Sequence, residues 1–297
     1  MRPGEWVMRK SYGGDVTFAI HQINGRLAIL KGVDVRLLAD APESDLIPVD
    51  PANLAQNVEL DRKRKERSIR QFGRLRRHNE QNVRSGGKLV PHNSYFEVPG
   101  RVLHLDGDQH YLQKSMQLYK ELRVPAAGYF VSEGNMAAAL RRLLPELQPD
   151  IVVVTGHDGI LKQRREKDIF NLSSYKNSHN FVNAVKVARE YDRSRDSLVI
   201  VAGACQSHFE ALLQAGANFA SSPRRVLIHA LDPLYIAAKV AYTPLRETVE
   251  IADILPHTLS GLEGLGGLET RGVYRIGLPR VSWTETAASA VQESVQG

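Results

Sequence analysis

Residues 150–159 have the sequence DIVVVTGHDG, and residues 197–208 have the sequence SLVIVAGACQSH. Each begins with a short, β-branched apolar run that breaks at small residues. Such runs are too short for helices and too uniformly apolar for half-exposed strands, so they predict neighbouring central strands of a parallel sheet. Ligands of such sheets bind at the carboxyl ends of the strands. We therefore expect His157 and Cys205, which follow these runs, to lie at one edge.

The segments around these runs alternate between strand-like and helix-like patterns. Strands separated by helices of this length form βαβ units, which predict a parallel sheet with helices on both faces. The other expected strands cover residues 101–105 and 127–131, and the expected helices cover residues 109–122, 136–147, 180–191 and a segment from directly after Cys205 to residue 215.

The first 50 residues have a different pattern from the rest. Short strand-like pieces, among them Val35–Leu38, are separated by turns, and Asn24-Gly25 between two apolar runs predicts a hairpin. We expect residues 1–50 to form a small, SH3-like β-barrel. Residues 51–94 then form a basic helical linker, residues 95–280 an α/β domain and residues 281–297 a flexible tail.

The linker carries much of the net charge of +6, with ten lysines and arginines between Arg62 and Arg84. Aromatic residues are almost absent from it, so a solvated helix is favoured over a nucleic-acid-binding patch. The chain has no apolar run long enough to span a bilayer and no secretory signal, which predicts a cytoplasmic protein without membrane contact. Its single cysteine excludes an internal disulfide framework.

Cys205 and His157 are the residue types that nucleophilic catalysis requires. A thiol attacks as the thiolate, so a catalytic cysteine needs a nearby imidazole or a helix N-terminus. Backbone donors for the oxyanion are expected from Cys205 and from the Asp158–Gly159 turn. The alternative is a buried structural thiol and a hydrogen-bonded structural histidine.

Asp106 and Asp108 follow the first predicted strand at the same edge. They could hold a metal ion, form the floor of a pocket for a basic substrate side chain, or only cap a turn. Gln206 is a further candidate for substrate binding. We expect no metal and no cofactor.

Two resemblances bear on this pair. Residues 203–206 (GACQ) lie 48 residues after His157, which resembles the caspase, gingipain and legumain clan of cysteine peptidases, although Asp158 stands where that clan has glycine. The chain looks closer to the YabG sporulation-specific proteases. This resemblance is carried by residues 9–12 (RKSY), 104–108 (HLDGD), 155–158 (TGHD), 202–210 (AGACQSHFE), 216–223 (GANFASSP), 228–233 (IHALDP) and 264–272 (GLGGLETRG).

The YabG resemblance implies a caspase-like domain and a cysteine peptidase that processes spore-coat proteins in the mother cell, with a preference for cutting after arginine. In that case the arginines of residues 62–84 are candidate sites of self-cleavage. Two other functions remain open from the sequence: a nucleic-acid-binding protein with an α/β scaffold, and a metal-dependent hydrolase that uses Asp106 and Asp108. The substrate proteins and the oligomeric state are not predicted.

Overall fold

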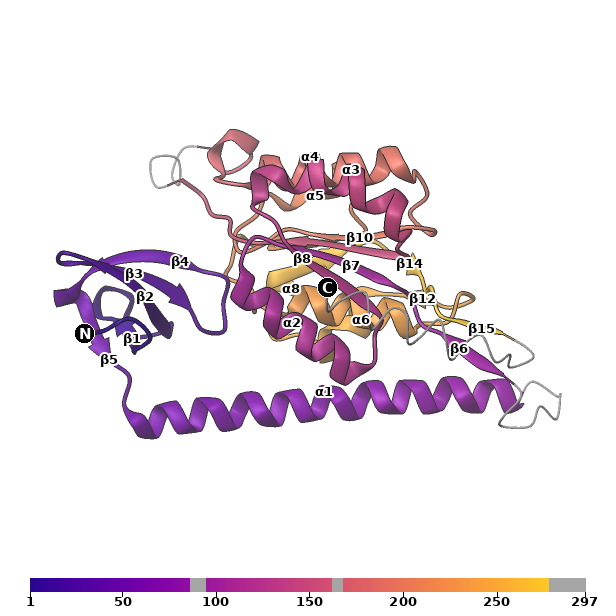
Figure 1. Cartoon of the computed structure of the whole chain (residues 1–297), viewed down its shortest axis with the longest axis horizontal. Helices are drawn as coiled ribbons and strands as arrows, with labels where there is room; N and C mark the ends of the chain where they lie inside the picture. Colours follow the sequence, from indigo (N-terminus) through magenta and orange to yellow (C-terminus); the bar gives the residue numbers. More distant parts are fainter. Residues whose placement is uncertain (86–94, 162–167, 278–297) are drawn as a thin grey trace.

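The computed structural model describes residues 1–85, 95–161 and 168–277. It contains an N-terminal antiparallel sheet, one long helix and a larger α/β part, in that order along the chain (Figure 1). Within these ranges, no helix has both the length and the hydropathy needed to cross a bilayer. The predicted tail, residues 281–297, lies outside the described residues.

The N-terminal module, residues 6–48, is a five-stranded antiparallel sheet with the strand order β4-β3-β2-β1-β5. Its strands are β1 (Trp6–Arg9), β2 (Phe18–Asn24), β3 (Leu27–Gly32), β4 (Leu38–Pro42) and β5 (Leu46–Pro48). Apolar side chains on alternate positions form its core, which includes Phe18, Ile20 and Leu30. The predicted hairpin at Asn24-Gly25 is confirmed, and Gly25 has a φ of +64°, which glycine adopts without strain.

The segment Val35–Leu38 does not form the strand that its apolar residues predicted. β3 ends at Gly32 and β4 begins at Leu38. Between them, the chain leaves the module and contacts the α/β part, where Val35 makes an isolated antiparallel bridge with His229. A contact with another part of the molecule therefore overrides the local preference.

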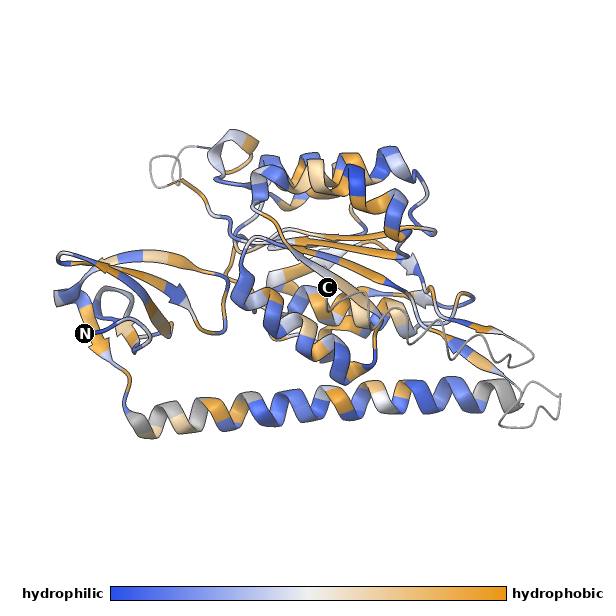
Figure 2. Ribbon diagram, in the orientation of Figure 1, coloured by the Kyte–Doolittle hydropathy of each residue, from blue (hydrophilic) through white to orange (hydrophobic). Residues whose placement is uncertain are grey.

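The basic segment forms the single helix α1 (Pro51–Ser85), which runs alongside the α/β part (Figure 1). Most of its residues are hydrophilic (Figure 2). The sequence predicted a solvated helix, but one face of α1 is packed. Phe72 is 1% exposed and its ring lies 4.9 Å from that of His257, and the side chain of Asn79 donates a hydrogen bond to the carbonyl O of Tyr242. These contacts attach α1 to the α/β part.

The α/β part is built on a six-stranded sheet with the order β13-β11-β10-β9-β7-β8. All neighbours are parallel except β13, which is antiparallel to β11. The strands are β7 (Val102–Asp106), β8 (Ala126–Phe130), β9 (Ile151–Thr155), β10 (Val199–Ala202), β11 (Phe219–Ser221) and β13 (Leu265–Gly267). The predicted parallel sheet is thus confirmed, with one antiparallel edge strand.

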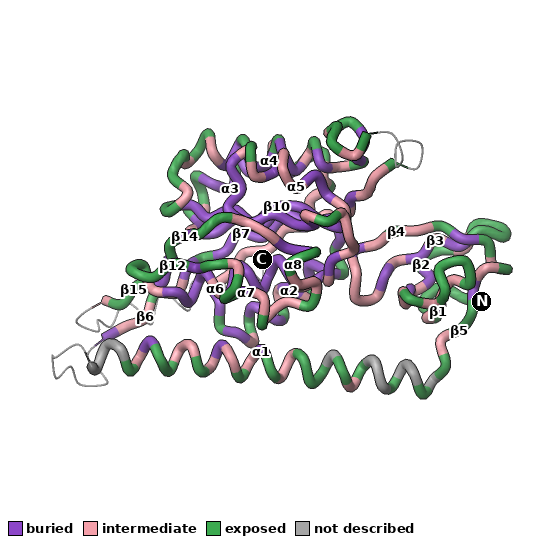
Figure 3. The backbone as a smooth tube through the Cα atoms, turned by 180° about the vertical axis from the view of Figure 1, so that it is seen from behind, coloured by how far each residue is buried: buried purple, intermediate pink, exposed green. Residues whose placement is uncertain are grey.

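Helices cover both faces of this sheet (Figure 1). One face packs against α3 (Met136–Leu147), α4 (Ser178–Tyr191) and α5 (Phe209–Ala215), and the other packs against α2 (Gln109–Leu122), α6 (Asp232–Tyr242) and α1. Successive residues of β9 alternate between the two hydrophobic clusters, as the two-residue period of a strand requires. The central strands are therefore buried throughout (Figure 3).

Smaller elements complete the described structure. β6 (Phe96–Val98) pairs with β15 (Arg275–Gly277), and β12 (Thr248–Val249) pairs with β14 (Thr270–Arg271). The short helices are η1 (Lys10–Tyr12), η2 (Glu43–Asp45), η3 (Glu133–Asn135), η5 (Leu172–Ser174), α7 (Ile251–Ile254), η6 (Leu255–His257) and α8 (Gly261–Gly264).

Candidate active site

The carboxyl ends of β7, β9 and β10 lie next to one another because the three strands are parallel neighbours. Asp106, the last residue of β7, is in register with Thr155, the last residue of β9. β9 is also in register with β10 over its length. The turns that follow β9 and β10 carry His157 and Cys205. The prediction that these residues follow adjacent strands is therefore confirmed.

Two carboxylates lie close to the ring of His157. Its Nε2 is 3.6 Å from Oδ2 of Asp108, and its Nδ1 is 3.9 Å from Oε1 of Glu133. The backbone N–H of His157 donates to Oε1 of Glu133 at 2.8 Å. Nε2 is buried and has no hydrogen-bond partner among the described residues. Burial lowers the pKa of His157, although the negative charge of Asp108 acts in the opposite direction, so the imidazole is neutral at pH 7.

Glu133 was not identified from the sequence. It lies in η3, just after β8, and reaches the site across two glycines. A Cβ on Gly107 would lie 2.2 Å from Oε1 of Glu133, and a Cβ on Gly156 would lie 2.5 Å from the same atom. The two glycines therefore leave the space that Glu133 needs to hold the backbone of His157. A carboxylate directly after a strand was the available signal.

Asp158 connects the turn after β9 to the turn after β10. Its buried carboxylate accepts hydrogen bonds from the N–H groups of Gly159 and Asn177 and from the hydroxyls of Ser178 and Ser207. The hydroxyl of Ser207 also accepts from the N–H of Ala204, next to Cys205. Burial raises the pKa of Asp158, and these hydrogen bonds oppose that rise. Asp158 thus couples the positions of the two turns.

The thiol of Cys205 is fully buried, but its contacts are polar. The N–H of Ile228 donates to Sγ at 3.2 Å, and the thiol donates to the carbonyl O of Ile228 at 3.6 Å. Burial raises the pKa of Cys205 to about 11, although the N–H of Ile228 and the charge and N–H of Arg36 act in the opposite direction. The thiol is therefore protonated at pH 7 in this arrangement.

The helix predicted directly after Cys205 begins later, which corrects one of the expectations for this residue. α5 starts at Phe209, because residues 203–208 form a tight turn in which Gly203 has a φ of +108° and Gln206 a φ of +54°. A helix dipole acts only within about one turn of the helix end. Because Cys205 lies before the start of α5, the helix dipole contributes little to the pKa of its thiol.

Among the described residues, no hydrogen bond joins Cys205 to His157. Arg36, from the loop between β3 and β4, acts electrostatically on the pKa of both groups. Its guanidinium is 4.9 Å from the ring centroid of Tyr111, and that ring lies 6.3 Å from the ring of His157. The positive charge of Arg36 thus acts on both candidate groups.

Asp106 holds the guanidinium of Arg36 in a fully buried, two-pronged ion pair. Nη1 donates to Oδ1 at 2.8 Å and Nη2 donates to Oδ2 at 2.9 Å, and both side chains are 0% exposed. Burial alone would raise the pKa of Asp106, but the charge of Arg36 and hydrogen bonds from His104 and Arg36 lower it to about 2. Asp106 is therefore an ionised carboxylate in a dry pocket, and it holds an arginine.

Asp108 has a different set of contacts. Its Oδ1 accepts from the N–H groups of His110 and Tyr111, so Asp108 caps the N-terminus of α2. Its Oδ2 pairs with Lys31 of the N-terminal module at 2.9 Å and faces His157. The capping interpretation thus describes one oxygen of Asp108, and the other oxygen belongs to the site.

The candidate oxyanion donors and Gln206 lie at the same edge. The N–H of Gly159 donates to the carboxylate of Asp158 at 2.8 Å. The N–H groups of Asp158 and Cys205 make no backbone hydrogen bond to another described residue. Gln206 donates its own N–H to the carbonyl of Val226, and its side chain faces Gly159.

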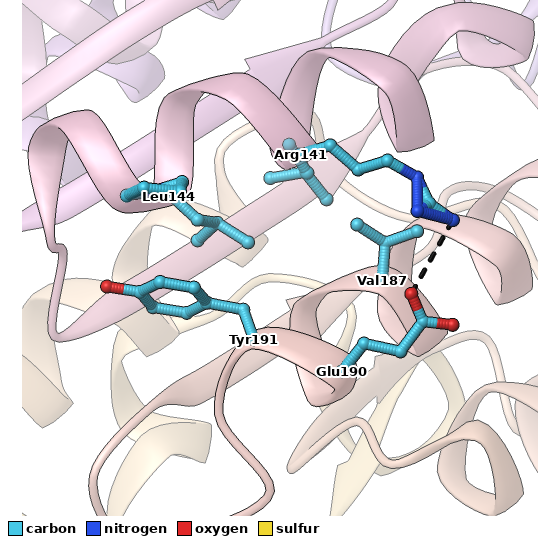
Figure 4. A pocket seen from close by; sticks show the side chains of 7 residues that line it. Arg141, Leu144, Val187, Glu190 and Tyr191 are labelled. Atoms are coloured by element: carbon cyan, nitrogen blue, oxygen red, sulfur yellow. Dashed lines mark ion pairs between the residues drawn. The ribbon is translucent and has the colours of Figure 1, made fainter.

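In the part of the chain that the structure describes, neither a group of metal ligands nor the surface hollow between α3 and α4 belongs to this edge of the sheet. Across the described ranges, no three His, Cys, Asp or Glu side chains form a group that could hold a metal ion. The hollow is lined by Leu144, Val187 and Tyr191 and is crossed by the Arg141–Glu190 ion pair (Figure 4). It lies at the far ends of these helices, about 15 Å along α4 from its start beside Asp158.

The comparisons with known proteins identify the family of the chain. The family model of the YabG peptidase U57 matches residues 2–279. The sporulation-specific protease YabG of Bacillus subtilis (strain 168) is 45% identical over 285 residues, which cover 93% of this chain and 97% of that protein. The matched region contains the N-terminal module, α1 and the strand ends that carry His157 and Cys205. The chain belongs to the YabG peptidase U57 family.

Proposed function

We propose that this protein is a cysteine endopeptidase of sporulation that cuts spore-coat proteins after arginine. The observation that carries the proposal is that His157 and Cys205 follow adjacent parallel strands, at the edge of the sheet where a buried, ionised Asp106 holds the side chain of Arg36. Membership of a protease family supports the reaction class. The cysteine mechanism and the preference for arginine rest on the side chains gathered at this site.

In the proposed mechanism, His157 takes the proton of Cys205 and the thiolate attacks the carbonyl carbon of the scissile bond. The N–H groups of Cys205 and Asp158 stabilise the oxyanion, whereas the N–H of Gly159, also expected as a donor, is bonded to the carboxylate of Asp158. His157 then gives the proton to the leaving amine as the C–N bond breaks, which leaves a thioester on Cys205. Water hydrolyses the thioester and restores the thiol. Glu133 holds the backbone of His157 in place during these steps.

The proposed substrate pocket is formed by Asp106, with Asp108 and Gln206 beside it. A planar guanidinium fits a carboxylate through two parallel hydrogen bonds, and an ammonium cannot reproduce this geometry. The bond pattern between Arg36 and Asp106 has this form. A substrate arginine in the same pocket would place its carbonyl near Cys205. This favours cutting after arginine over cutting after lysine.

We further propose a division of the chain into an SH3-like β-barrel at residues 1–50, a basic linker at 51–94, a caspase-like peptidase domain at 95–280 and a tail at 281–297. The order of parallel strands and the location of His157 and Cys205 at two strand ends support the caspase-like assignment. We propose that the enzyme acts in the mother cell on the forming coat. The name of the Bacillus subtilis relative, a sporulation-specific protease, supports a role in sporulation.

The test is cleavage of a fluorogenic peptide with arginine before the reporter, and of spore-coat protein. Cys205→Ala and His157→Ala are expected to abolish cleavage, whereas Glu190→Gln, in the ion pair between α3 and α4, is expected to cleave at the wild-type rate. A thiol alkylator should inactivate the enzyme and a chelator should not. Cleavage by folded Cys205→Ala, or inactivation by the chelator, would contradict the proposal.

A further inference from the structure

The loop between β3 and β4 enters the candidate active site from the N-terminal module. Arg36, in this loop, is completely buried although the loop connects strands of a different sheet from the one that contains Asp106. Besides the ion pair with Asp106, Nε and Nη2 of Arg36 both donate to the carbonyl O of Ala230, at 3.1 and 2.9 Å. Four hydrogen bonds thus hold one guanidinium. This is a complete binding site for an arginine side chain.

The backbone of the same loop binds as an added strand. The N–H of Ala230 donates to the carbonyl O of Asp34 at 2.8 Å, and Val35 forms an antiparallel bridge with His229. The segment that receives the loop continues to Ile228, whose main chain contacts the thiol of Cys205. Peptides commonly bind proteins by adding a strand whose backbone gives affinity while a side-chain pocket gives specificity. The loop makes both kinds of contact.

Further contacts fasten the loop to the α/β part. The hydroxyl of Tyr111 donates to the carbonyl oxygens of Gly32 and Val35. Lys114 donates to the carbonyl of Val33 at 3.3 Å, and Lys31 pairs with Asp108. Two basic residues and one hydroxyl therefore hold the part of the loop that precedes Arg36.

After Arg36, the chain turns back at once. The N–H of Leu37 donates to the carbonyl of Val35 at 2.8 Å, and the carbonyl of Leu37 accepts from the N–H of Gly32 at 2.7 Å. These two bonds return the chain to the module. A cleft that accepts a protein substrate must hold an extended chain on both sides of the scissile bond. Residues 32–37 therefore do not continue as an extended chain beyond Arg36.

We propose that residues 34–37 are a built-in ligand of the substrate-binding cleft, with Arg36 in the pocket that receives the arginine of a protein substrate, and that a substrate binds only when this loop withdraws. The inference rests on the proposed function for the meaning of the pocket. It adds that the loop of the N-terminal module competes with substrate for the arginine pocket and thereby inhibits the enzyme. In this proposal the loop also restricts access to Cys205, because the charge and the backbone N–H of Arg36 act on its thiol.

Exchange of the loop for a substrate is physically feasible because the charge in the pocket is conserved. Withdrawal of Arg36 alone would leave the ionised Asp106 without its partner in a buried pocket, which is costly. The arginine of an incoming substrate restores the same ion pair. On the outer side of the loop, a cavity of about 270 Å³ lies between Val35 and Leu60 of α1, so the loop is not enclosed by packed core on that side.

The first experiment measures binding of the tripeptide acetyl-Asp-Val-Arg-amide, which copies residues 34–36, by calorimetry in a Cys205→Ala background. The chain with Arg36→Ala is expected to bind it at least tenfold more tightly than the chain that keeps Arg36. A peptide with citrulline in place of arginine has the same shape without the charge and should not bind. Addition of Asp106→Asn to the Arg36→Ala chain should abolish binding of the arginine peptide.

Equal affinity of the chains with and without Arg36, or equal affinity for the arginine and citrulline peptides, would overturn the proposal. Binding does not require turnover, so it separates this inference from the proposed function. If the chain binds the peptide as expected but cuts no substrate, the inference of a built-in ligand stands and the proposed peptidase function fails. If the chain cuts substrate but Arg36 has no effect on peptide binding, the proposed peptidase function stands and the inference of a built-in ligand fails.

The second experiment measures the rate at which iodoacetamide alkylates Cys205, with folding checked by circular dichroism. Tyr111→Phe keeps the ion pair but removes the hydroxyl that holds the loop, and it is the variant to use if Arg36→Ala does not fold. Either variant is expected to react at least several-fold faster than wild type, and Arg36→Lys is expected to lie between them and wild type. Ethylguanidinium should slow the reaction of Arg36→Ala. Wild-type alkylation rates in folded Arg36→Ala and Tyr111→Phe would refute the inference.

Discussion

Replacement of Asp106 by asparagine tests the strongest electrostatic contact of the site. The substitution keeps the size of the side chain but removes the negative charge opposite Arg36, and both side chains are fully buried. Removing one partner of a buried ion pair costs about 3–5 kcal/mol, because the other charge remains buried without compensation. We therefore expect Asp106→Asn to lower the free energy of unfolding by about 3–5 kcal/mol.

The pKa of Asp106 gives an independent value for the same contact. A shift from 3.8 to about 2 corresponds to roughly 2–3 kcal/mol of stability. Because the pKa is lower in the folded protein, this contribution is complete above about pH 4 and is lost as the pH falls toward 2. It is smaller than the mutational cost because a protonated carboxyl still accepts hydrogen bonds from Arg36. The substitution value is the better guide at neutral pH.

The assay is urea unfolding at pH 7 followed by circular dichroism, for Asp106→Asn, Arg36→Met and the double variant. The matched control is Glu190→Gln, in an ion pair whose side chains are more than half exposed, which should cost under about 1 kcal/mol. The double variant should be clearly more stable than the sum of the single losses predicts. A loss below about 1 kcal/mol for Asp106→Asn, or strictly additive losses, would refute the reasoning.

Three further predictions concern the site and α1. A Cβ on Gly156 would displace Glu133. Gly156→Ala should therefore lower the kcat for an arginyl peptide about tenfold, while the midpoint of urea unfolding stays near that of wild type. An unchanged kcat would show that Glu133 does not position His157. Because the pKa of Cys205 is raised to about 11, its alkylation rate should keep rising from about pH 8 to about pH 10, and a plateau by pH 8 would contradict the burial argument. Purified wild type should slowly cut itself within residues 62–84. These residues are part of α1, so the helix must unwind locally before it can be cut. An intact N-terminus after long incubation, or equal cleavage in Cys205→Ala, would count against self-cleavage.

The sequence was most informative where the signal is local. The helices predicted at residues 109–122 and 136–147 have those bounds in the structure, because their apolar period and their end signals lie within each segment. The strand-like runs before His157 and Cys205 are equally clear, and parallel pairing of such runs follows from the βαβ order. The edge that carries the candidate site could therefore be located from sequence alone.

The contents of the site depend on residues that are far apart in the chain. Arg36 lies 70 residues before Asp106, in a segment whose apolar neighbours predicted a strand, and no local pattern indicates that its side chain is buried against that carboxylate. Glu133 reaches His157 only because two glycines leave room for it. The role of Asp158 in connecting two turns depends on Ser207, 49 residues later. Contacts of this kind arise from the packing of whole elements.

By itself, then, the sequence determined the parallel sheet, the helices on its two faces and the strand ends at which His157 and Cys205 stand, because short-range periodicity and turn residues control these features. Only the tertiary structure decided what fills the space between those strand ends. The docking of the N-terminal module puts Arg36 opposite Asp106, and burial among residues from separate parts of the chain raises the pKa of Cys205. The physical reason is that burial and charge pairing depend on the neighbours a residue acquires on folding, and these neighbours come from separate parts of the chain.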